Sequence, residues 1–216
     1  MKQKIIAVIP ALNEENTIAE VLKSIKKFVD KTIVVDDGSK DKTQMISKEN
    51  SAIVVSHDTN MGYDKSIDDG FKEAIKYNPT VIFTFDADGQ HNSSDIQKFI
   101  NPIIEKKADV VVGIRPKKQR LSENLFSHYS RKRIGIGDPL CGIKSYSAEA
   151  YKKVGYFDKL NSIGTELMFN CYKYGYKIIE VKVGMNTRQD TPRFGNKIKS
   201  NLRILNALIK IYFKFR

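Results

Sequence analysis

The chain changes from apolar to acidic within residues 81–91, Val81-Ile82-Phe83-Thr84-Phe85-Asp86-Ala87-Asp88-Gly89-Gln90-His91. A run of strand-forming residues ends there at two carboxylates that stand one residue apart. Residues i and i+2 of a strand point to the same side, so Asp86 and Asp88 can turn their oxygens toward one point where the strand ends. Such hard oxygen ligands suit Mg²⁺ or Mn²⁺, with substrate phosphates completing the shell. The alternative is an Asp-Gly turn whose carboxylates cap the next helix.

Strand and helix patterns alternate five times over the first half of the chain. We expect strands at residues 4–9, 32–35, 52–56, 81–85 and 109–113, with amphipathic helices between them. This alternation predicts an α/β fold with a mostly parallel sheet and helices on both faces. Ligands of such sheets bind at the carboxyl ends of the strands. Three of those ends carry acidic or polar loops, at residues 10–15, 36–39 and 86–90.

The second half of the chain is more basic. Residues 115–133 contain seven Lys or Arg and one acid, Glu123. Alternating residues around Cys141–Ser145 predict a strand, residues 166–174 a helix and residues 177–183 another strand. Residues 197–216 have a helical pattern with six Lys or Arg and no acid.

The composition is that of a globular protein with one large domain. The chain has 216 residues, of which 41% are hydrophobic and 29% charged. Two cysteines give neither a metal spacing nor a disulfide framework. Because no apolar run is long enough to span a membrane and no secretory pattern opens the sequence, we expect a cytoplasmic setting. The net charge of +12 indicates an anionic partner, which could be nucleic acid, anionic lipid or a phosphorylated substrate.

Seven short motifs resemble the family-2 glycosyltransferases of GT-A fold, and most closely the dolichol- or polyprenol-phosphate sugar (mannosyl or glucosyl) synthases. The resemblance covers nearly the whole chain, and the order and spacing of the motifs make it specific. In chain order, they are Ile9-Pro10-Ala11-Leu12-Asn13-Glu14-Glu15, Val34-Val35-Asp36-Asp37-Gly38-Ser39, Asn60-Met61-Gly62-Tyr63, Asp86-Ala87-Asp88-Gly89-Gln90-His91, Asp138-Pro139-Leu140-Cys141-Gly142-Ile143-Lys144, Glu166-Leu167 and Gly175-Tyr176-Lys177-Ile178-Ile179-Glu180-Val181.

The resemblance implies a role for each matching residue on the donor side. The nucleotide would be contacted by residues of the first two loops and covered by a late basic segment; these residues are Pro10, Leu12, Glu14, Asp36, Asp37, Arg188, Arg193 and Lys197. The divalent cation, Mg²⁺ or Mn²⁺, would be held against the donor diphosphate by Asp86, Asp88 and Gln90.

The resemblance also implies an acceptor side. Residues matching the acceptor-binding positions are Arg115, Arg131, Gly142 and Lys144, with Asp138 in the loop that faces the acceptor. One departure is Asp64, which stands after Tyr63 where the family usually has a small glycine; its carboxylate would alter the sugar pocket or face water.

The expected function is metal-dependent, inverting transfer of a sugar from a GDP- or UDP-sugar to a polyprenyl phosphate. A phosphate monoester, with a second pKa of about 6, is already largely ionised at neutral pH and needs little help from a base. Transfer to a sugar hydroxyl of a lipid-linked or surface glycan is the alternative, and it would need a base, for which Glu166 and Asp138 are the candidates. A non-catalytic domain that binds nucleotide sugar or nucleic acid is the other alternative. We expect no nucleic-acid partner, since no such motif is present.

The last residues of the chain indicate a membrane surface. We expect a glycosyltransferase domain at residues 1–195 and a basic amphipathic helix at 196–216. Apolar residues with interleaved cations suit a helix that lies on an anionic bilayer, at the cytoplasmic face, and its six cations argue against a spanning helix. Packing of this helix on the domain is the alternative.

Overall fold

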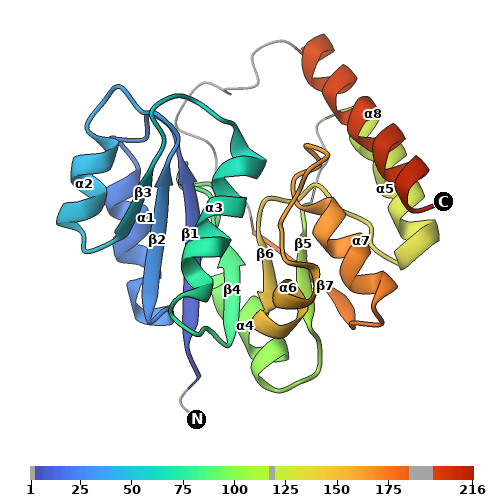
Figure 1. Cartoon of the computed structure of the whole chain (residues 1–216), viewed down its shortest axis with the longest axis horizontal. Helices are drawn as coiled ribbons and strands as arrows, with labels where there is room; N and C mark the ends of the chain where they lie inside the picture. Colours follow the sequence, from blue (N-terminus) through green and yellow to red (C-terminus); the bar gives the residue numbers. More distant parts are fainter. Residues whose placement is uncertain (1–2, 117–119, 185–196) are drawn as a thin grey trace.

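A seven-stranded sheet in the order β3-β2-β1-β4-β6-β5-β7 forms the centre of the computed structural model, which describes residues 3–116, 120–184 and 197–216 (Figure 1). The strand β6 is antiparallel to both its neighbours, and the other neighbouring pairs are parallel. This confirms the mostly parallel α/β sheet. The strands are β1 Ile5–Ala11, β2 Lys31–Asp36, β3 Ile53–Ser56, β4 Val81–Thr84, β5 Val110–Ile114, β6 Lys144–Ser147 and β7 Ile178–Lys182.

Helices cover both faces of the sheet, as the alternation predicts (Figure 1). Because successive strand residues point to opposite faces, Ile6 and Val8 pack with α3 on one face, and Ala7 and Ile9 pack with α1 and α4 on the other. The helices are α1 Ile18–Ile25, α2 Thr43–Glu49, α3 Tyr63–Ile75, α4 Ile96–Ile104, α5 Leu121–Ile134, α6 Ala148–Val154, α7 Thr165–Lys173 and α8 Lys197–Lys214.

Two helices, α5 and α6, were not expected from the sequence. The buried side of α5 carries the polar residues Ser122, Glu123, Ser127 and Ser130 beside Phe126, so apolar spacing gives no helical signal. The short α6 begins at a side-chain cap, where Ser147 Oγ accepts a hydrogen bond from the amide of Ala150 at 3.2 Å.

The C-terminal helix α8 lies alongside α5 and runs in the same direction (Figure 1). Ser122 Oγ donates to Asn201 Oδ1 at 2.6 Å near one end, and Arg133 donates to the carbonyl of Phe215 at the other. Ala207 and Ile211 are buried in the core beneath. The helix therefore packs on the α/β body, while the expected boundary at 195/196 falls at the edge of the undescribed segment and stays a prediction. Among the described residues, no helix is both long and apolar enough to cross a membrane.

Asp64, in the first turn of α3, is buried and does not face water. Its exposed fraction is 4%, and its Oδ1 accepts a hydrogen bond from the amide of Gly164 at 3.2 Å. Burial raises the pKa of Asp64 first, and the charge of Asp158 raises it further. Lys144, the Gly164 amide and Arg203 oppose this shift, leaving the pKa at about 7. The native state thus keeps a proton on Asp64 between its ordinary pKa and about 7.

We predict that Asp64→Asn stabilises the protein at high pH only. Because the native pKa of Asp64 is raised, the free-energy cost of its buried charge grows as the pH rises from the ordinary pKa to about 7. Above that pH the cost has its full value. Asn keeps an acceptor for the Gly164 amide without that charge. The free energy of unfolding in urea should therefore rise by about 1–4 kcal/mol at pH 8, and the gain should disappear near pH 4. A gain of equal size at both pH values would contradict the burial of a titrating carboxylate.

Candidate active site

The predicted loops meet at one edge of the sheet. Strands β2, β1 and β4 are consecutive neighbours and parallel, so the loops after them, at residues 36–39, 10–15 and 86–90, lie side by side. The antiparallel strand β6 begins at this same edge, next to the end of β4, and brings the loop 135–143 there. Arg115 follows β5, whose end is also at this edge.

Hydrogen bonds between backbone amides and side chains, in both directions, join the loop after β1 to the loop after β2 and the start of α2. The amide of Asn13 donates to Ser39 Oγ at 2.9 Å, and the amide of Lys40 donates to Asn13 Oδ1 at 2.8 Å. The amide of Glu14 donates to Thr43 Oγ1 at 2.7 Å. These bonds hold the segment that contains Pro10, Leu12 and Glu14. Pro10 and Leu12 are partly exposed, and Glu14 is buried. Their contact with a nucleotide stays a prediction.

Asp37 holds the loop that follows β3. Its Oδ1 accepts a hydrogen bond from the amide of Met61 at 2.8 Å, and its Oδ2 accepts one from the amide of Gly62 at 2.9 Å. His57 Nδ1 is also 2.8 Å from Oδ1. Neighbouring Asp36 is buried too, and its Oδ1 accepts from the amide of Ser39 at 3.2 Å. Both carboxylates thus shape the expected nucleotide pocket, and direct contact with base or ribose stays a prediction.

Asp86 lies among polar groups at the end of β4. Its Oδ2 is 3.0 Å from His91 Nε2, and the Tyr63 hydroxyl donates to its Oδ1 at 3.4 Å. Burial alone would raise the pKa of Asp86, but the hydrogen bond and charge of His91, the Tyr63 hydroxyl and the charge of Lys144 hold it below its ordinary value. Asp86 is therefore a carboxylate at neutral pH.

The loop of Asp86 and Asp88 fits a divalent cation that substrate phosphates complete. The Asp86 side chain is 27% exposed, and Asp88 Oδ1 accepts from the amide of Gln90 at 3.0 Å, which folds the loop back on itself. No group of three or more His, Cys, Asp and Glu side chains in the described ranges could hold a metal ion by itself. An ionised carboxylate with a second carboxylate two residues away is a donor set for Mg²⁺ or Mn²⁺. Binding by Asp86, Asp88 and Gln90 stays a prediction.

Gly142 forms the wall opposite Asp86. A Cβ atom on Gly142 would lie 2.5 Å from Asp86 Oδ2, so only glycine allows this approach. The Thr84 hydroxyl donates to the carbonyl of Gly142 at 2.5 Å and accepts from the amide of Lys144 at 2.9 Å. The loop that resembles the acceptor side is thereby fixed against the expected metal site.

Asp138 and Arg115 form a two-bond ion pair beside this wall. Arg115 Nε and Nη2 donate to the two oxygens of Asp138, each at 2.8 Å, and the Arg115 amide donates to Oδ2 at 3.0 Å. Burial lowers the pKa of Arg115, but the bonds and charge of Asp138 raise it above its ordinary value. Glu180 accepts from the amides of Gly137 and Asp138 at 2.7 and 3.0 Å. Asp138 is only 1% exposed and is fully engaged with its own chain.

Lys144 points inward. It is 1% exposed, and its ammonium donates to the carbonyls of Cys141 and Ile163 at 2.7 and 2.6 Å. Burial lowers the pKa of Lys144, and nearby acidic groups offset this only in part. In this conformation Lys144 joins two loops behind the site, so the expected contact with an acceptor would require it to move.

Glu166 is completely buried in the first turn of α7. It accepts hydrogen bonds from the Tyr156 hydroxyl at 3.0 Å and the amide of Lys159 at 2.6 Å. The ammonium of Lys214, in the last turn of α8, forms an ion pair with it. Glu166 therefore anchors the C-terminal helix to α7.

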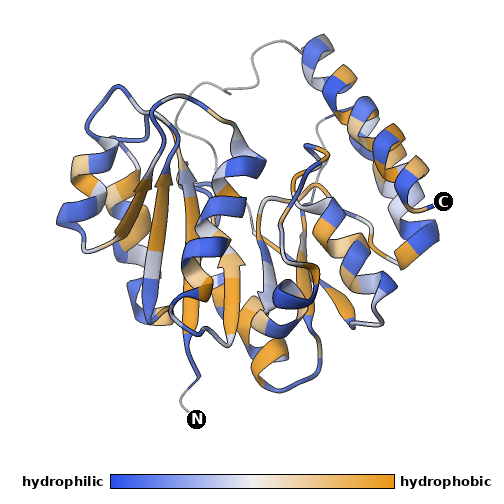
Figure 2. Ribbon diagram, in the orientation of Figure 1, coloured by the Kyte–Doolittle hydropathy of each residue, from blue (hydrophilic) through white to orange (hydrophobic). Residues whose placement is uncertain are grey.

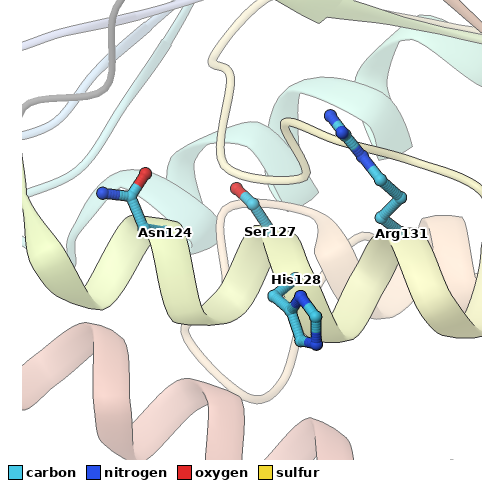
Figure 3. A pocket seen from close by; sticks show the side chains of 4 residues that line it. All are labelled: Asn124, Ser127, His128 and Arg131. Carbon is cyan, nitrogen blue, oxygen red and sulfur yellow. The ribbon is translucent and has the colours of Figure 1, made fainter.

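Arg131 lines an open pocket of about 190 Å³ on α5 (Figure 3). The other lining residues are Asn124, Ser127 and His128. In Figure 3 Asn124, Ser127 and Arg131 point to one side of the helix, and His128 points to the other. A Cβ atom on Gly137 would lie 2.3 Å from Arg131 Nη2, so the guanidinium lies against the residue next to Asp138. The structure thus brings Arg131 to the same loop as the Arg115–Asp138 pair.

Three predicted nucleotide residues cannot be placed. Arg188 and Arg193 lie outside the described residues, and Lys197 begins α8 but its side chain is not described. Sequence reasoning also missed partners of Asp86: Tyr63 and His91 stood in the motifs without a role. The spacing of His91, five residues after Asp86, is the signal that could have drawn attention to it.

Comparison with known proteins identifies the family. The sequence profile described as "Glycosyl transferase family 2" matches residues 6–174. An uncharacterised protein of Methanocaldococcus jannaschii is 33% identical over 96% of this chain and 92% of its own length. The UDP-N-acetylglucosamine–dolichyl-phosphate N-acetylglucosaminyltransferase of Methanococcus voltae is 37% identical over 67% of this chain and 70% of its own.

A solved structure shows the same fold. Glucosyl-3-phosphoglycerate synthase of Mycobacterium tuberculosis, crystallised with Mn²⁺ and UDP-glucose, superposes with a TM-score of 0.77. The match covers 96% of this chain and 78% of that chain at 21% identity. It confirms the GT-A fold that the motifs predict. With the family profile and the relatives, it follows that the chain belongs to glycosyl transferase family 2 and is a glycosyltransferase.

Proposed function

We propose that this glycosyltransferase transfers a sugar from a UDP- or GDP-sugar to a polyprenyl phosphate, with inversion and with Mg²⁺ or Mn²⁺. The choice of acceptor rests on one observation, which is that both candidate bases are buried in ion pairs. Asp138 is buried in its two-bond pair with Arg115, and Glu166 is buried against Lys214. A hydroxyl acceptor would need one of them within reach of its proton. A phosphate acceptor, whose second ionisation has a pKa of about 6, is already largely ionised at neutral pH and does not depend on either carboxylate.

The donor side of the proposal rests on the loop of Asp86 and Asp88. These carboxylates, with Gln90, would hold the cation, which when bound neutralises charge that develops on the leaving diphosphate. The loops bound together by Asn13, Ser39 and Asp37 would hold the nucleotide beside it. Arg188, Arg193 and Lys197 are the residues we expect to cover the diphosphate.

The acceptor side rests on the pocket of α5. Arg131 offers a guanidinium, and Ser127 and Asn124 offer polar groups on the same side of the helix (Figure 3). A guanidinium binds phosphate through two parallel hydrogen bonds, which suits the head of a lipid phosphate. The relative from Methanococcus voltae, named for a dolichyl-phosphate acceptor, supports the same assignment.

A screen of donors and acceptors tests the proposal. Purified protein with Mn²⁺ or Mg²⁺ is given UDP- and GDP-sugars, with and without a short-chain polyprenyl phosphate, and release of nucleoside diphosphate is followed. We expect release only when both a cation and the lipid phosphate are present. Release that is equally fast with and without the lipid phosphate would sink the phosphate acceptor.

Matched variants control that screen. Asp86→Asn and Asp88→Asn should lower turnover about a thousandfold, since several kcal/mol of charge stabilisation is lost with the cation. Glu49→Gln, an exposed acid on α2, should turn over like the wild type. Near-normal rates in either aspartate variant would refute the metal assignment.

Arg131→Met should raise KM for the lipid phosphate about 10- to 100-fold, because a hydrogen bond to a charged group contributes about 1.5–3 kcal/mol. KM for the donor should stay unchanged. His128→Gln is the control, since His128 touches the same pocket but points to the other side of α5 (Figure 3). Equal acceptor KM values in the Arg131 variant and the wild type would remove Arg131 from the phosphate site.

Glu166→Gln separates an anchor from a general base. If Glu166 anchors α8, the variant should lose about 1–3 kcal/mol of stability in urea unfolding, because a buried ionic hydrogen bond is weakened. Its turnover should stay within about threefold, whereas loss of a base costs 10²- to 10⁴-fold. Lys214→Met should resemble it in both measurements. A hundredfold loss of turnover in Glu166→Gln alone would restore Glu166 as the base.

A further inference from the structure

The outward side of helices α5 and α8 is unusually apolar for a protein surface. Ten large hydrophobic side chains are exposed in the described part of the chain, and six of them lie on these two helices. Leu121 is 76% exposed and Phe213 is 69% exposed. The six are Leu121, Leu125, Leu202, Ile209, Tyr212 and Phe213. Clustering of this kind marks a surface that contacts a partner.

The exposed apolar residues of α8 form a stripe opposite its packed side. At about 100° per residue, Leu202, Ile209 and Phe213 fall within an arc of about 40°. The buried residues Ala207 and Ile211 lie on the other side of the helix. In Figure 2 apolar and polar residues alternate along α8, as expected for a helix whose sides have different surroundings. The stripe is therefore not needed to pack α8 on the protein.

The outward face of α5 continues this stripe. Leu121, Leu125 and Lys132 fall within an arc of about 40° on α5. Ser122 and Tyr129, which contact Asn201 and Tyr212 of α8, lie to one side of that arc. Because the two helices run side by side in the same direction, their apolar stripes flank the contact between them (Figure 1). We call these stripes, Leu121, Leu125, Leu202, Ile209 and Phe213, the outer face.

Cations border the outer face. Lys132 lies on the same side of α5 as Leu121 and Leu125, and Lys199 and Lys210 lie next to the stripe on α8, all three exposed. Glu123 is the single acid in the sequence of both helices, and it is 3% exposed and paired with Arg120. The outer face thus presents apolar side chains and positive charge together. A second copy of the chain in a two-fold dimer would set these cations against themselves, which disfavours self-association.

We propose that the outer face of α5 and α8 docks on an anionic lipid bilayer, with the helices parallel to its surface. Apolar side chains would enter the boundary of headgroups and acyl chains, and Lys132, Lys199 and Lys210 would contact anionic headgroups. Docking of this face places the pocket of Asn124, Ser127 and Arg131 beside the membrane surface, because it lies on an adjoining side of α5. The proposal extends the proposed function by giving the site its partner, and it can be measured without any sugar donor.

Vesicle binding tests the docking. Protein is sedimented with vesicles of phosphatidylcholine containing phosphatidylglycerol, and with vesicles of pure phosphatidylcholine. The wild type should bind the anionic vesicles, more weakly at high salt because exposed charges are screened. Ile209→Gln with Phe213→Gln should weaken binding about tenfold, and Leu121→Gln with Leu125→Gln should do the same from the other helix. Lys199→Gln with Lys210→Gln should weaken it about tenfold.

Matched controls lie on α2, at the other end of the sheet (Figure 1). Met45→Gln removes a side chain that is 49% exposed there, and Lys48→Gln removes an exposed cation. Both should bind vesicles like the wild type. Thermal unfolding of each variant shows that it is folded, and glutamine is used because it favours helices.

Two results would overturn the docking: wild-type binding to anionic vesicles no stronger than to neutral ones, or unchanged binding in both apolar double variants. A wild-type dimer that the Ile209 and Phe213 changes convert to a monomer would assign the face to a second copy instead. The proposed function fails separately. If no lipid phosphate is turned over while vesicle binding follows the prediction, the docking stands and the acceptor assignment falls.

Discussion

The arrangement of the site depends on the close approach of Gly142 to Asp86. The carboxylate fills the space where any side chain at residue 142 would stand, and the Thr84 hydroxyl holds the Gly142 carbonyl from the end of β4. This contact exists because β6 is antiparallel and starts at the edge where β4 ends. If the strand at that position were parallel to β4, the loop that follows it would lie at the site in place of the loop that precedes it. Because this one strand is reversed, the loop 135–143 lies opposite the loop 86–90.

Buried charges behind this contact hold the loops in place. Lys144 bonds two carbonyls, Asp138 binds Arg115 with both oxygens, and Glu180 accepts two amides of the same loop. Removing one partner of such a pair leaves a buried charge uncompensated, which costs several kcal/mol. The loop 135–143 is therefore held by bonds at several residues, and a site whose groups are fixed in advance favours a reaction that needs orientation and charge stabilisation. Residues that the family pattern suggested for direct contact act in this structure first as supports.

Residue patterns predicted the sheet and the position of the site well, because both follow from period and strand ends. The alternation of Ile6, Ala7, Val8 and Ile9 gives two buried faces, and the acidic ends of β2 and β4 lie together as expected. The patterns failed for α5, whose buried side holds Ser122, Ser127 and Ser130 rather than an apolar stripe. They also could not show that Asp37, Lys144 and Glu166 have partners far away in sequence. Those contacts depend on tertiary packing, and no local period encodes them.

Helix α5 carries both the pocket of the proposed acceptor site and part of the outer face. One side of it, with Asn124, Ser127 and Arg131, faces the pocket, and the outward side carries Leu121 and Leu125. A lipid phosphate has the same division, with a charged head on an apolar chain. Under the proposed function, one helix would contact both parts if it presented a cation and an apolar stripe on adjoining faces. Helix α5 has this arrangement, with Asn124, Ser127 and Arg131 at i, i+3, i+7 and with Leu121 and Leu125 at i, i+4. The weak apolar periodicity of α5 follows from its three different surroundings, since only Phe126 and Ile134 of this helix are buried apolar residues.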